Sequence, residues 1–414
     1  MEAATVPPPP QRRKKTQDHS NTTTTTISDL PSHITCDVLS RLPLNSIFYC
    51  KRLCSSFRNP TLEPYFPQLH LPKSPFSLIL YRPSDFEHPI FGYLPLDDSL
   101  VDLHRRSRWT MKFEAKIIHP TCFEFLSNRI VSSCNGLILL SDAKWSNNVC
   151  VCNPITRQHF FLPKPDEDLC LLRRGRYFYC GYGFGYSRST DLFKVVKFTA
   201  NYKEQPYRLH CCVYTLGVDD EWRTLGSTRQ PVPYNPDLPF VFLNGALHWI
   251  SWERSTWLLC YFDMEKEQCG NQTFRLHSKK LNLSAVPSSL EGTRFHLGVV
   301  DNCLYIRDEQ TSPLPVNIWV MKDYGDIRSW NLEWIIQRPL PSGLNQDLKP
   351  VKTLEDGTVL MTVRKKVLAS YNPVTKVLQR VSYHGVQFWE DLIVGVLSFL
   401  PLPCKNHQLK LCRS

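Results

Sequence analysis

The sequence lacks an apolar run long enough to cross a membrane. Its longest such run, Leu392–Leu400, is far shorter than the ~20 residues that a spanning helix needs. Residues 1–15 contain no apolar segment of the kind that directs secretion. We therefore expect the 16 cysteines to stay reduced and the protein to be soluble, without a membrane partner, in the cytoplasm, the nucleus or both.

Signatures for metals and phosphate are also missing. The G-x-G-x-G run Gly181–Gly185 fails the G-x-G-x-x-G spacing and precedes no helix signal, so we expect a strand there. Three cysteine pairs are close in sequence, but none has C-x2-C spacing with a matching downstream pair. These pairs are Cys50/Cys54, Cys150/Cys152 and Cys211/Cys212. The sequence therefore predicts no metal site and no cofactor.

Catalytic signatures are absent in the same way, because no nucleophile, base and orienting group stand at recognisable positions. His248 lies beside Trp249 in a strand-like run, where a histidine is more often a satisfied core or rim residue than a catalyst. Asp219 and Asp220 belong to a turn, where aspartate has a backbone role. We predict no catalytic residue and no enzyme activity.

Positive charge is present but dispersed. The formal net charge is +11, and a short basic run, Arg12–Lys15, supplies part of it. No helix-turn-helix, RRM or zinc-finger signature organises the basic and aromatic residues, so we expect no nucleic-acid partner. Residues 1–27 combine proline, basic and threonine runs with almost no apolar residues, which predicts a disordered tail.

Two short amphipathic helices are predicted within Leu30–Phe57. Ile34, Val38 and Leu42 recur every four residues and so share one helical face, and Pro43 ends this first helix. Asn45 or Ser46 would cap the second helix. Its apolar stripe is Ile47, Cys50, Cys54 and Phe57. Helices this short are marginal alone, so the unit must pack against the rest of the chain or against another protein.

The order and spacing of several residues in this stretch resemble the F-box motif. They are Leu30-Pro31, Ile34, Asp37-Val38-Leu39, Arg41-Leu42-Pro43 and Leu53-Cys54. The resemblance implies docking onto a Skp1-type adaptor and, through it, onto a cullin-based ubiquitin ligase. It implies as adaptor-contacting residues Leu30, Pro31, Ile34, Val38, Leu39, Leu42, Pro43, Leu44, Ile47, Cys50, Leu53 and Cys54. Phe57 replaces the tryptophan that the family usually has, and His33 and Thr35 replace apolar or acidic residues, so we expect weakened docking.

Prolines recur through residues 58–75 and predict a stiff connector. From Phe76 onward, short runs rich in β-branched and aromatic residues alternate with turn residues, which is typical of strands. The predicted strands are Gly136–Leu140, Val149–Cys152, Phe193–Phe198, Val241–Trp249, Leu258–Phe262, Leu304–Ile306, Asn317–Val320, Thr358–Val363 and Val367–Tyr371.

A strand-like segment recurs along this region at intervals of roughly 45–65 residues, the range of propeller blades. Its copies are CNGLILL at Cys134, GYGFGY at Gly181, LNGALHWI at Leu243, LGVVDNCLYI at Leu297 and LEDGTVLMTV at Leu354. An Asn-Pro-x-Thr turn occurs at Asn153 and again at Asn372, where asparagine can bond its own backbone. We predict a propeller of about six blades, with seven as the alternative, closed by Phe76–Tyr81 and Asp391–Leu400.

The paired CNGLILL and NPITRQHFFLP segments, downstream of an F-box-like stretch, resemble the kelch-related F-box-associated domain of the large plant F-box families. The chain departs from a well-formed kelch repeat because it has no Gly-Gly doublet. The expected fold class is thus α+β and multidomain. The expected parts are a tail (1–27), a helical F-box (28–74), an all-β propeller-like domain (75–400) and a C-terminal tail (401–414).

The function implied by both resemblances is that of a non-catalytic substrate receptor in a Skp1–cullin–F-box ubiquitin ligase, whose propeller binds an unknown target protein. Target contacts are expected in loops, with Arg173–Tyr179 and Trp252–Trp257 as candidates because aromatic and arginine residues are enriched at binding hot spots. The alternatives are a propeller that binds a small ligand or glycan and has a secondary F-box, or an enzyme with a polar site in the central channel.

Overall fold

A computed structural model of the protein divides the chain into two compact units, Met1–Glu63 and Pro64–Ser414. The predicted tail, residues 1–27, lies outside the described residues. The described residues are 30–82, 90–96, 110–112, 128–142, 148–164, 178–201, 209–228, 231–233, 240–253, 256–273, 294–309, 315–337, 340, 344, 347–363, 367–384, 391–405 and 410–411.

The described part of the first unit consists of short helices. They are α1 (Ser32–Ser40), α2 (Leu44–Leu53), α3 (Ser55–Arg58) and the 3-10 helix η2 (Asn59–Leu62). Two prolines precede α1 and α2 as N-cap residues, with φ of −55° at Pro31 and −56° at Pro43. The predicted capping of the second helix by Asn45 or Ser46 is therefore wrong, because the helix already begins at Leu44.

The predicted stripe on the second helix is interrupted in the structure. The helix α2 ends at Leu53, and Cys54 has an extended backbone with φ of −156° and ψ of 165°. Phe57 therefore lies on the separate helix α3. A single stripe from Ile47 to Phe57 was a wrong prediction, because the extended residue breaks the helical periodicity between its two halves.

The proline-rich connector is helical where it enters the second unit. It forms α4 (Phe66–His70) and the 3-10 helix η3 (Leu71–Lys73), and prolines occupy the first turns of both. Proline suits these positions because its missing N–H has no partner in a first turn. Phe66 and His70 pack against the ring of Phe399, at centroid distances of 5.5 and 5.1 Å. The α4 helix is thus anchored on the C-terminal part of its own unit.

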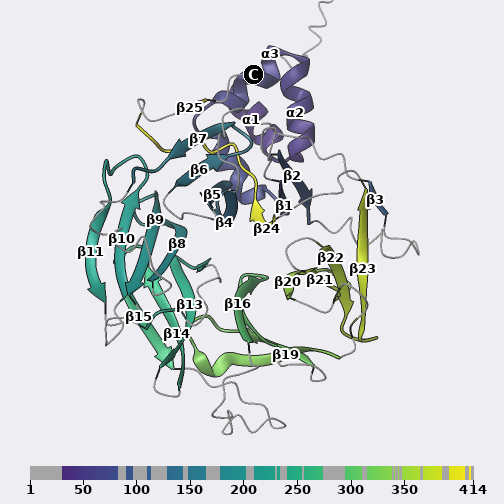
Figure 1. Cartoon of the computed structure of the whole chain (residues 1–414). Helices are drawn as coiled ribbons and strands as arrows, with labels where there is room; N and C mark the ends of the chain where they lie inside the picture. The colour runs from purple at the N-terminus through teal and green to yellow at the C-terminus, as the bar shows by residue number, and fades with distance from the viewer. Residues whose placement is uncertain are drawn as a thin grey trace, which may run out of the picture. The chain divides into compact units, whose positions relative to one another are not determined.

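Six sheets form the blades of a six-bladed propeller in the second unit, which confirms the predicted fold and the blade number (Figure 1). Blade 1 contains β24 (Asp391–Val396), β1 (Phe76–Arg82) and β2 (Ile90–Pro95). Blade 2 contains β4 (Asn128–Cys134), β5 (Leu137–Asp142), β6 (Val149–Asn153), β7 (Gln158–Phe161) and β25 (Lys410–Leu411). Blade 3 contains β8 (Phe178–Ser187), β9 (Leu192–Asn201), β10 (Leu209–Thr215) and β11 (Arg223–Thr228).

The remaining three blades follow in chain order. Blade 4 contains β12 (Val241–Leu243), β13 (Ala246–Glu253), β14 (Thr256–Asp263) and β15 (Gln268–Thr273). Blade 5 contains β16 (Arg294–Val300), β17 (Cys303–Glu309), β18 (Val316–Met321) and β19 (Trp330–Ile336). Blade 6 contains β20 (Leu348–Thr353), β21 (Val359–Val363), β22 (Val367–Asn372), β23 (Val377–His384) and the parallel strand β3 (Thr110–Lys112).

Blade 1 closes the ring by joining the two ends of the propeller, as the sequence predicts. The strand β24, drawn in yellow beside the dark β1 in Figure 1, pairs antiparallel with β1, with Phe76 opposite Val396 and Leu80 opposite Leu392. Leu80 and Leu392 lie in one buried cluster with Leu360 of blade 6. On the other side, Ser133 of β4 donates a hydrogen bond to the carbonyl of Val394 at 3.0 Å. Blade 1 therefore contacts blade 6 through an apolar cluster and blade 2 through a hydrogen bond.

The recurrent segments found in the sequence mostly mark hairpin turns between the first two strands of a blade. Asn135 and Gly136 both have positive φ, as do Asn244 and Gly245, which suits the tight turns of twisted hairpins. The predicted strand Val241–Trp249 is consequently two strands, because its Asn-Gly pair forms the turn. The GYGFGY copy differs, since it lies within strand β8. Its Gly183 leaves room for the Leu247 side chain, because a Cβ at this position would come within 2.3 Å of that side chain.

The Asn-Pro-x-Thr segments form the turns that join the third and fourth strands of blades 2 and 6. The Asn153 side-chain oxygen accepts a hydrogen bond from the Ile155 N–H at 2.8 Å, and that of Asn372 accepts one from Val374 at 2.9 Å. These bonds confirm the backbone role predicted for the asparagines. Asp263 plays the same part in blade 4, accepting from the Glu265 N–H at 2.9 Å.

The chain continues to contribute to the propeller after Leu400. Leu402 is buried among residues of blades 2 and 3, and its N–H donates to the Gln158 side chain at 2.8 Å. The Asn153 amide donates to the carbonyls of Ser398 and Leu400 at 3.1 and 2.7 Å. The sequence predicts a tail at 401–414, but its described residues include a segment around Leu402 that packs on the propeller. Lys410–Leu411 add a fifth strand to blade 2.

We expect Leu392→Ala to lower the free energy of unfolding of the propeller by about 2–4 kcal/mol, since it leaves a cavity where the chain ends meet. Val374→Ala is the control, because that side chain is 88% exposed in a turn and should change stability by no more than about 0.5 kcal/mol. Urea denaturation followed by tryptophan fluorescence measures both. Equal effects of the two substitutions would show that the closure contributes little.

Candidate adaptor-binding surface and polar clusters of the propeller

An exposed apolar row runs along α1 in the first unit. Leu30, Ile34 and Val38 are 40%, 41% and 51% exposed. Ile34 and Val38 lie about one turn apart on the same side of α1, and Leu30 directly precedes the N-cap residue Pro31. An ion pair from Arg41 to Asp37, at 2.7 Å, lies beside this row. Three more of the predicted adaptor-contacting residues are exposed, namely Pro31, Pro43 and Leu53.

The other predicted contact residues are less accessible. Leu42, Cys50 and Cys54 are half-buried, whereas Leu39, Leu44 and Ile47 are buried. On the buried side of α1, the Cys36 thiol donates a hydrogen bond to the Pro60 carbonyl at 3.3 Å, which ties α1 to η2. The structure therefore divides the predicted set, and its exposed members form the surface that a partner can reach.

Sequence reasoning missed two exposed apolar side chains in this unit, Tyr49 on α2 and Leu62 on η2. Tyr49 stands two residues after Ile47, so it lies off the apolar stripe that defined the second helix. Leu62 lies in residues 58–75, the proline-rich stretch that the sequence predicts to be a stiff connector. Neither position carried a periodic signal that could have identified it.

The two predicted target-binding segments are placed differently. Residues 173–177 lie outside the described residues, and Tyr179 is buried. Trp252 and Trp257 face each other across the β13–β14 hairpin with ring centroids 4.6 Å apart, and Trp257 contacts Phe295 of blade 5 at 4.5 Å. Both tryptophans are half-buried, so this pair contributes both to packing between blades and to the surface.

His248 is a satisfied structural residue, as the sequence analysis favoured. Its Nδ1 lies 3.2 Å from the Val241 carbonyl, which can only accept, so Nδ1 carries the proton. Its Nε2 then accepts from the Tyr324 hydroxyl of blade 5 at 3.0 Å. Burial lowers the pKa of His248 to about 4, which keeps the ring neutral. The histidine thus links blades 4 and 5 by hydrogen bonding.

A charged cluster links blades 5 and 6. The fully buried Arg307 of β17 donates to the Leu348 carbonyl at 2.6 Å and to the Asp347 carboxylate at 3.0 Å. Lys349 lies 3.3 Å from the same carboxylate. Burial alone would raise the pKa of Asp347, but the charges of Lys349 and Arg307 outweigh it and hold the pKa below its usual range. The cluster is organised as ion pairs that join two blades.

A second charged cluster joins blades 3 and 4 around Glu267. Arg223 donates to both carboxylate oxygens of Glu267, at 2.8 and 3.0 Å, and Lys194 donates to one of them at 2.9 Å. The Lys194 ammonium also reaches the Met264 carbonyl at 2.7 Å. The hydrogen bond from Arg223 is the main cause that lowers the pKa of Glu267 to about 2. Glu267 is therefore ionised at any physiological pH.

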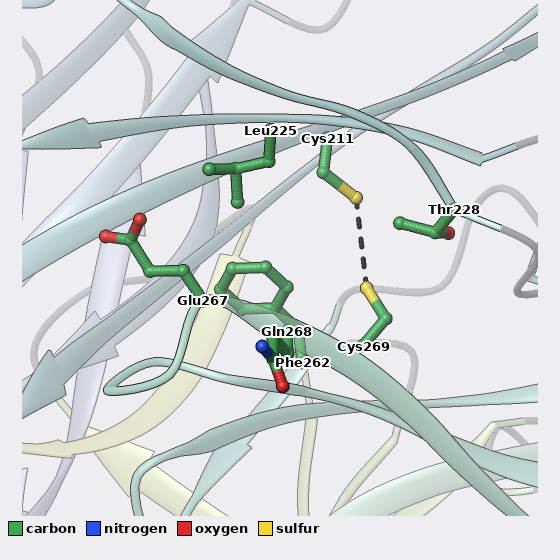
Figure 2. Close-up of a pocket in the computed structure, with 7 residues that line it drawn as sticks. All are labelled: Cys211, Leu225, Thr228, Phe262, Glu267, Gln268 and Cys269. Carbon is green, nitrogen blue, oxygen red and sulfur yellow. Dashed lines mark hydrogen bonds between the residues drawn. The ribbon is translucent and has the colours of Figure 1, made fainter.

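A pocket of about 310 Å³ adjoins this cluster (Figure 2). Its walls come from β10 and β11 of blade 3 and from β14 and β15 of blade 4. The lining residues are Cys211, Leu225, Thr228, Phe262, Glu267, Gln268 and Cys269. Figure 2 shows the sulfurs of Cys211 and Cys269 directed toward each other. The pocket thus combines an apolar floor with two thiols and a carboxylate.

Among the described residues, no helix has the length and the apolar composition of a membrane-spanning segment. No group of three or more histidine, cysteine, aspartate or glutamate side chains within the described ranges is placed to hold a metal ion.

We expect Glu267→Gln to destabilise the propeller by about 1–3 kcal/mol at pH 7, because it removes the charge that Lys194 and Arg223 share. The folded-state pKa of Glu267 is depressed to about 2, below the ~4.3 of an unfolded chain. Its contribution is therefore complete above about pH 4.3 and is lost as the pH falls toward 2. Denaturation of both proteins at several pH values should show the difference shrinking over that range. Glu221→Gln, at an exposed glutamate in the neighbouring turn, is the control, and an equal effect there would contradict the assignment.

Comparisons with known proteins agree with this division of the chain. A family model described as an F-box domain matches residues 27–59, and one described as an F-box associated beta propeller domain matches residues 104–401. F-box protein At3g07870 of Arabidopsis thaliana is 25% identical over 91% of this chain and 93% of its own length. F-box protein CPR1 of the same plant is 24% identical over 84% of this chain and 80% of its own length.

A third relative, F-box/kelch-repeat protein At3g23880 of Arabidopsis thaliana, is 22% identical over 83% of this chain and 88% of its own length. A solved fungal lectin with a six-bladed β-propeller fold aligns with a TM-score of 0.36 at 11% identity, over 76% of this chain and 97% of its own, and that similarity is too low to carry an argument. The propeller family model matches well over half of the chain and follows an F-box match. The protein therefore belongs to the family of F-box proteins that carry an F-box-associated β-propeller domain.

Proposed function

We propose that this protein is the target-binding subunit of a Skp1–cullin–F-box ubiquitin ligase. The observation that carries the proposal is the set of exposed apolar residues Ile34 and Val38 on α1 and Leu30 just before it, within a segment that matches the F-box family. Exposed apolar side chains gathered on a small helical unit are typical of protein-binding sites. The adaptor binds this row, and the cullin is reached through the adaptor.

The propeller presents the target to the ligase. Binding residues concentrate on loops that a rigid scaffold holds in place, and the six blades supply such a scaffold. The half-buried pair Trp252 and Trp257 is one candidate contact, because tryptophan is enriched at hot spots. The target is a protein, as in the receptor role implied by the family.

The proposed mechanism is proximity and involves no bond chemistry by this chain. Holding a target on the propeller and the adaptor on the F-box raises the effective concentration of the target near the ubiquitin-charged enzyme. The charged residues of the propeller, such as Glu267, Arg307 and Asp347, make ion pairs between blades. The protein acts in the cytoplasm, the nucleus or both, where such ligases meet their targets.

Val38→Asp should weaken binding to a purified Skp1-type adaptor by at least about 30-fold, because a charge would be buried in the centre of the apolar contact. The double substitution Leu30→Ala/Pro31→Ala should also abolish detectable adaptor binding at micromolar concentrations. Isothermal titration with the full-length protein measures both effects.

The matched control is Val374→Asp, the same replacement at an exposed valine in a turn of the propeller, which should leave adaptor affinity unchanged. Circular dichroism checks that each variant remains folded. Wild-type affinity in the Val38→Asp variant would refute the binding surface, and failure of the wild-type protein to bind any Skp1-type adaptor would refute the ligase role.

A further inference from the structure

Two cysteines from neighbouring blades meet at the pocket beside Glu267. Cys211 lies on β10 of blade 3 and Cys269 on β15 of blade 4, and their sulfurs are 3.9 Å apart. Strands β11, β12, β13 and β14 lie between them in the sequence, so only the packing of the two blades brings them together. Figure 2 shows the dashed contact between the two sulfur atoms.

The surroundings allow a small molecule to reach the pair. Both cysteines line the pocket of about 310 Å³, whereas a water molecule takes up only about 30 Å³ of the liquid. Cys211 is buried and Cys269 is half-buried. The pocket therefore gives a reagent access to the pair, and Cys269 is the more exposed of the two cysteines.

The contacts favour Cys269 as the reactive member. The two sulfurs share a hydrogen bond in which either thiol can be the donor, and this bond is the main cause that lowers the pKa of Cys269. The Thr228 hydroxyl supplies a second hydrogen bond that acts in the same direction. The same pairing, together with burial, raises the pKa of Cys211. Since the thiolate is the nucleophile, both directions favour Cys269 over Cys211 as the attacking sulfur.

We propose that Cys269 and Cys211 form a peroxide-reactive site, in which oxidation produces a reversible disulfide between blades 3 and 4. The arrangement has a half-buried cysteine that lines a pocket and a buried second cysteine whose sulfur is 3.9 Å away, and redox-sensing cysteines are often placed next to a resolving cysteine in this way. The site is independent of the ligase role proposed above, because it lies in the propeller and uses none of the adaptor-binding residues.

The chemistry balances with hydrogen peroxide as the oxidant. The Cys269 thiolate attacks one peroxide oxygen, the O–O bond breaks, and the products are a sulfenic acid at Cys269 and one water molecule once the departing hydroxide takes up a proton. Cys211 then loses its proton and attacks the Cys269 sulfur. The S–S bond forms, the S–O bond breaks, and the hydroxide leaves as a second water molecule. Two thiols are oxidised by two electrons in all, and one peroxide is reduced.

The geometry requires only a local adjustment. The sulfurs have to approach from 3.9 Å to the roughly 2.05 Å of a disulfide. The ion pairs of Glu267 with Lys194 and Arg223 hold the same two blades in register beside the pair.

The test is oxidation of the native full-length protein with hydrogen peroxide, followed by alkylation of the remaining thiols, tryptic digestion without reductant and mass spectrometry. Trypsin releases Cys269 in the peptide that follows Lys266, and releases Cys211 together with Cys212 in the peptide that follows Arg208. The expected result is one cross-linked pair of these peptides that disappears after dithiothreitol.

Variants assign the sulfur atoms. Cys212→Ser, at the adjacent residue whose sulfur contacts Thr224 rather than Cys269, should keep the cross-link. Cys211→Ser should abolish it and leave a sulfenic acid at Cys269 that dimedone traps. Alkylation of both Cys211 and Cys269 in peroxide-treated wild-type protein, under conditions that oxidise glutathione, would overturn the proposal without recourse to any variant. A cross-link that survives Cys211→Ser would also overturn it.

Discussion

The pairing of β24 with β1 is the contact on which the propeller depends. A row of twisted sheets that is not closed exposes unpaired strand edges and leaves the outer faces of its first and last blades without a partner. Here the last long strand of the chain completes a sheet begun by the first, and Leu80 and Leu392 join the apolar cluster that blade 1 shares with blade 6. The segment around Leu402 then packs against blades 2 and 3.

Polar residues at the borders between blades hold neighbouring blades together. Glu267 bridges blades 3 and 4, His248 bridges blades 4 and 5, and Arg307 bridges blades 5 and 6. Each is buried or half-buried and has a partner on the next blade, so its charge or hydrogen-bonding capacity is already used. Buried polar groups are costly unless they are paired, and pairing them across blades also fixes the angle between adjacent sheets.

The helical unit and the propeller differ in how much of their apolar surface they bury. The propeller buries apolar clusters between its neighbouring sheets, whereas the short helices α1 and α2 leave Ile34, Val38 and Leu53 at their surface. A surface of this kind is stabilised by a partner that covers it. The proposed reactive thiol pair lies in the propeller, where the packing of two blades holds Cys211 against Cys269.

Local sequence patterns determined the elements and much of the architecture. Strand runs, Asn-Pro-x-Thr turns and the recurrence of a strand-like segment predicted a propeller of about six blades, and the terminal runs predicted its closure, because these features depend on neighbours within a few residues or on a repeat. The F-box-like stretch was recognisable for the same reason. Tertiary structure decided which members of that stretch are exposed, since Leu39, Leu44 and Ile47 share the apolar character of Ile34 and Val38 but are buried. It alone brought together Cys211 and Cys269, or Arg307 and Asp347, because contacts between blades join residues whose separation in the sequence carries no signal.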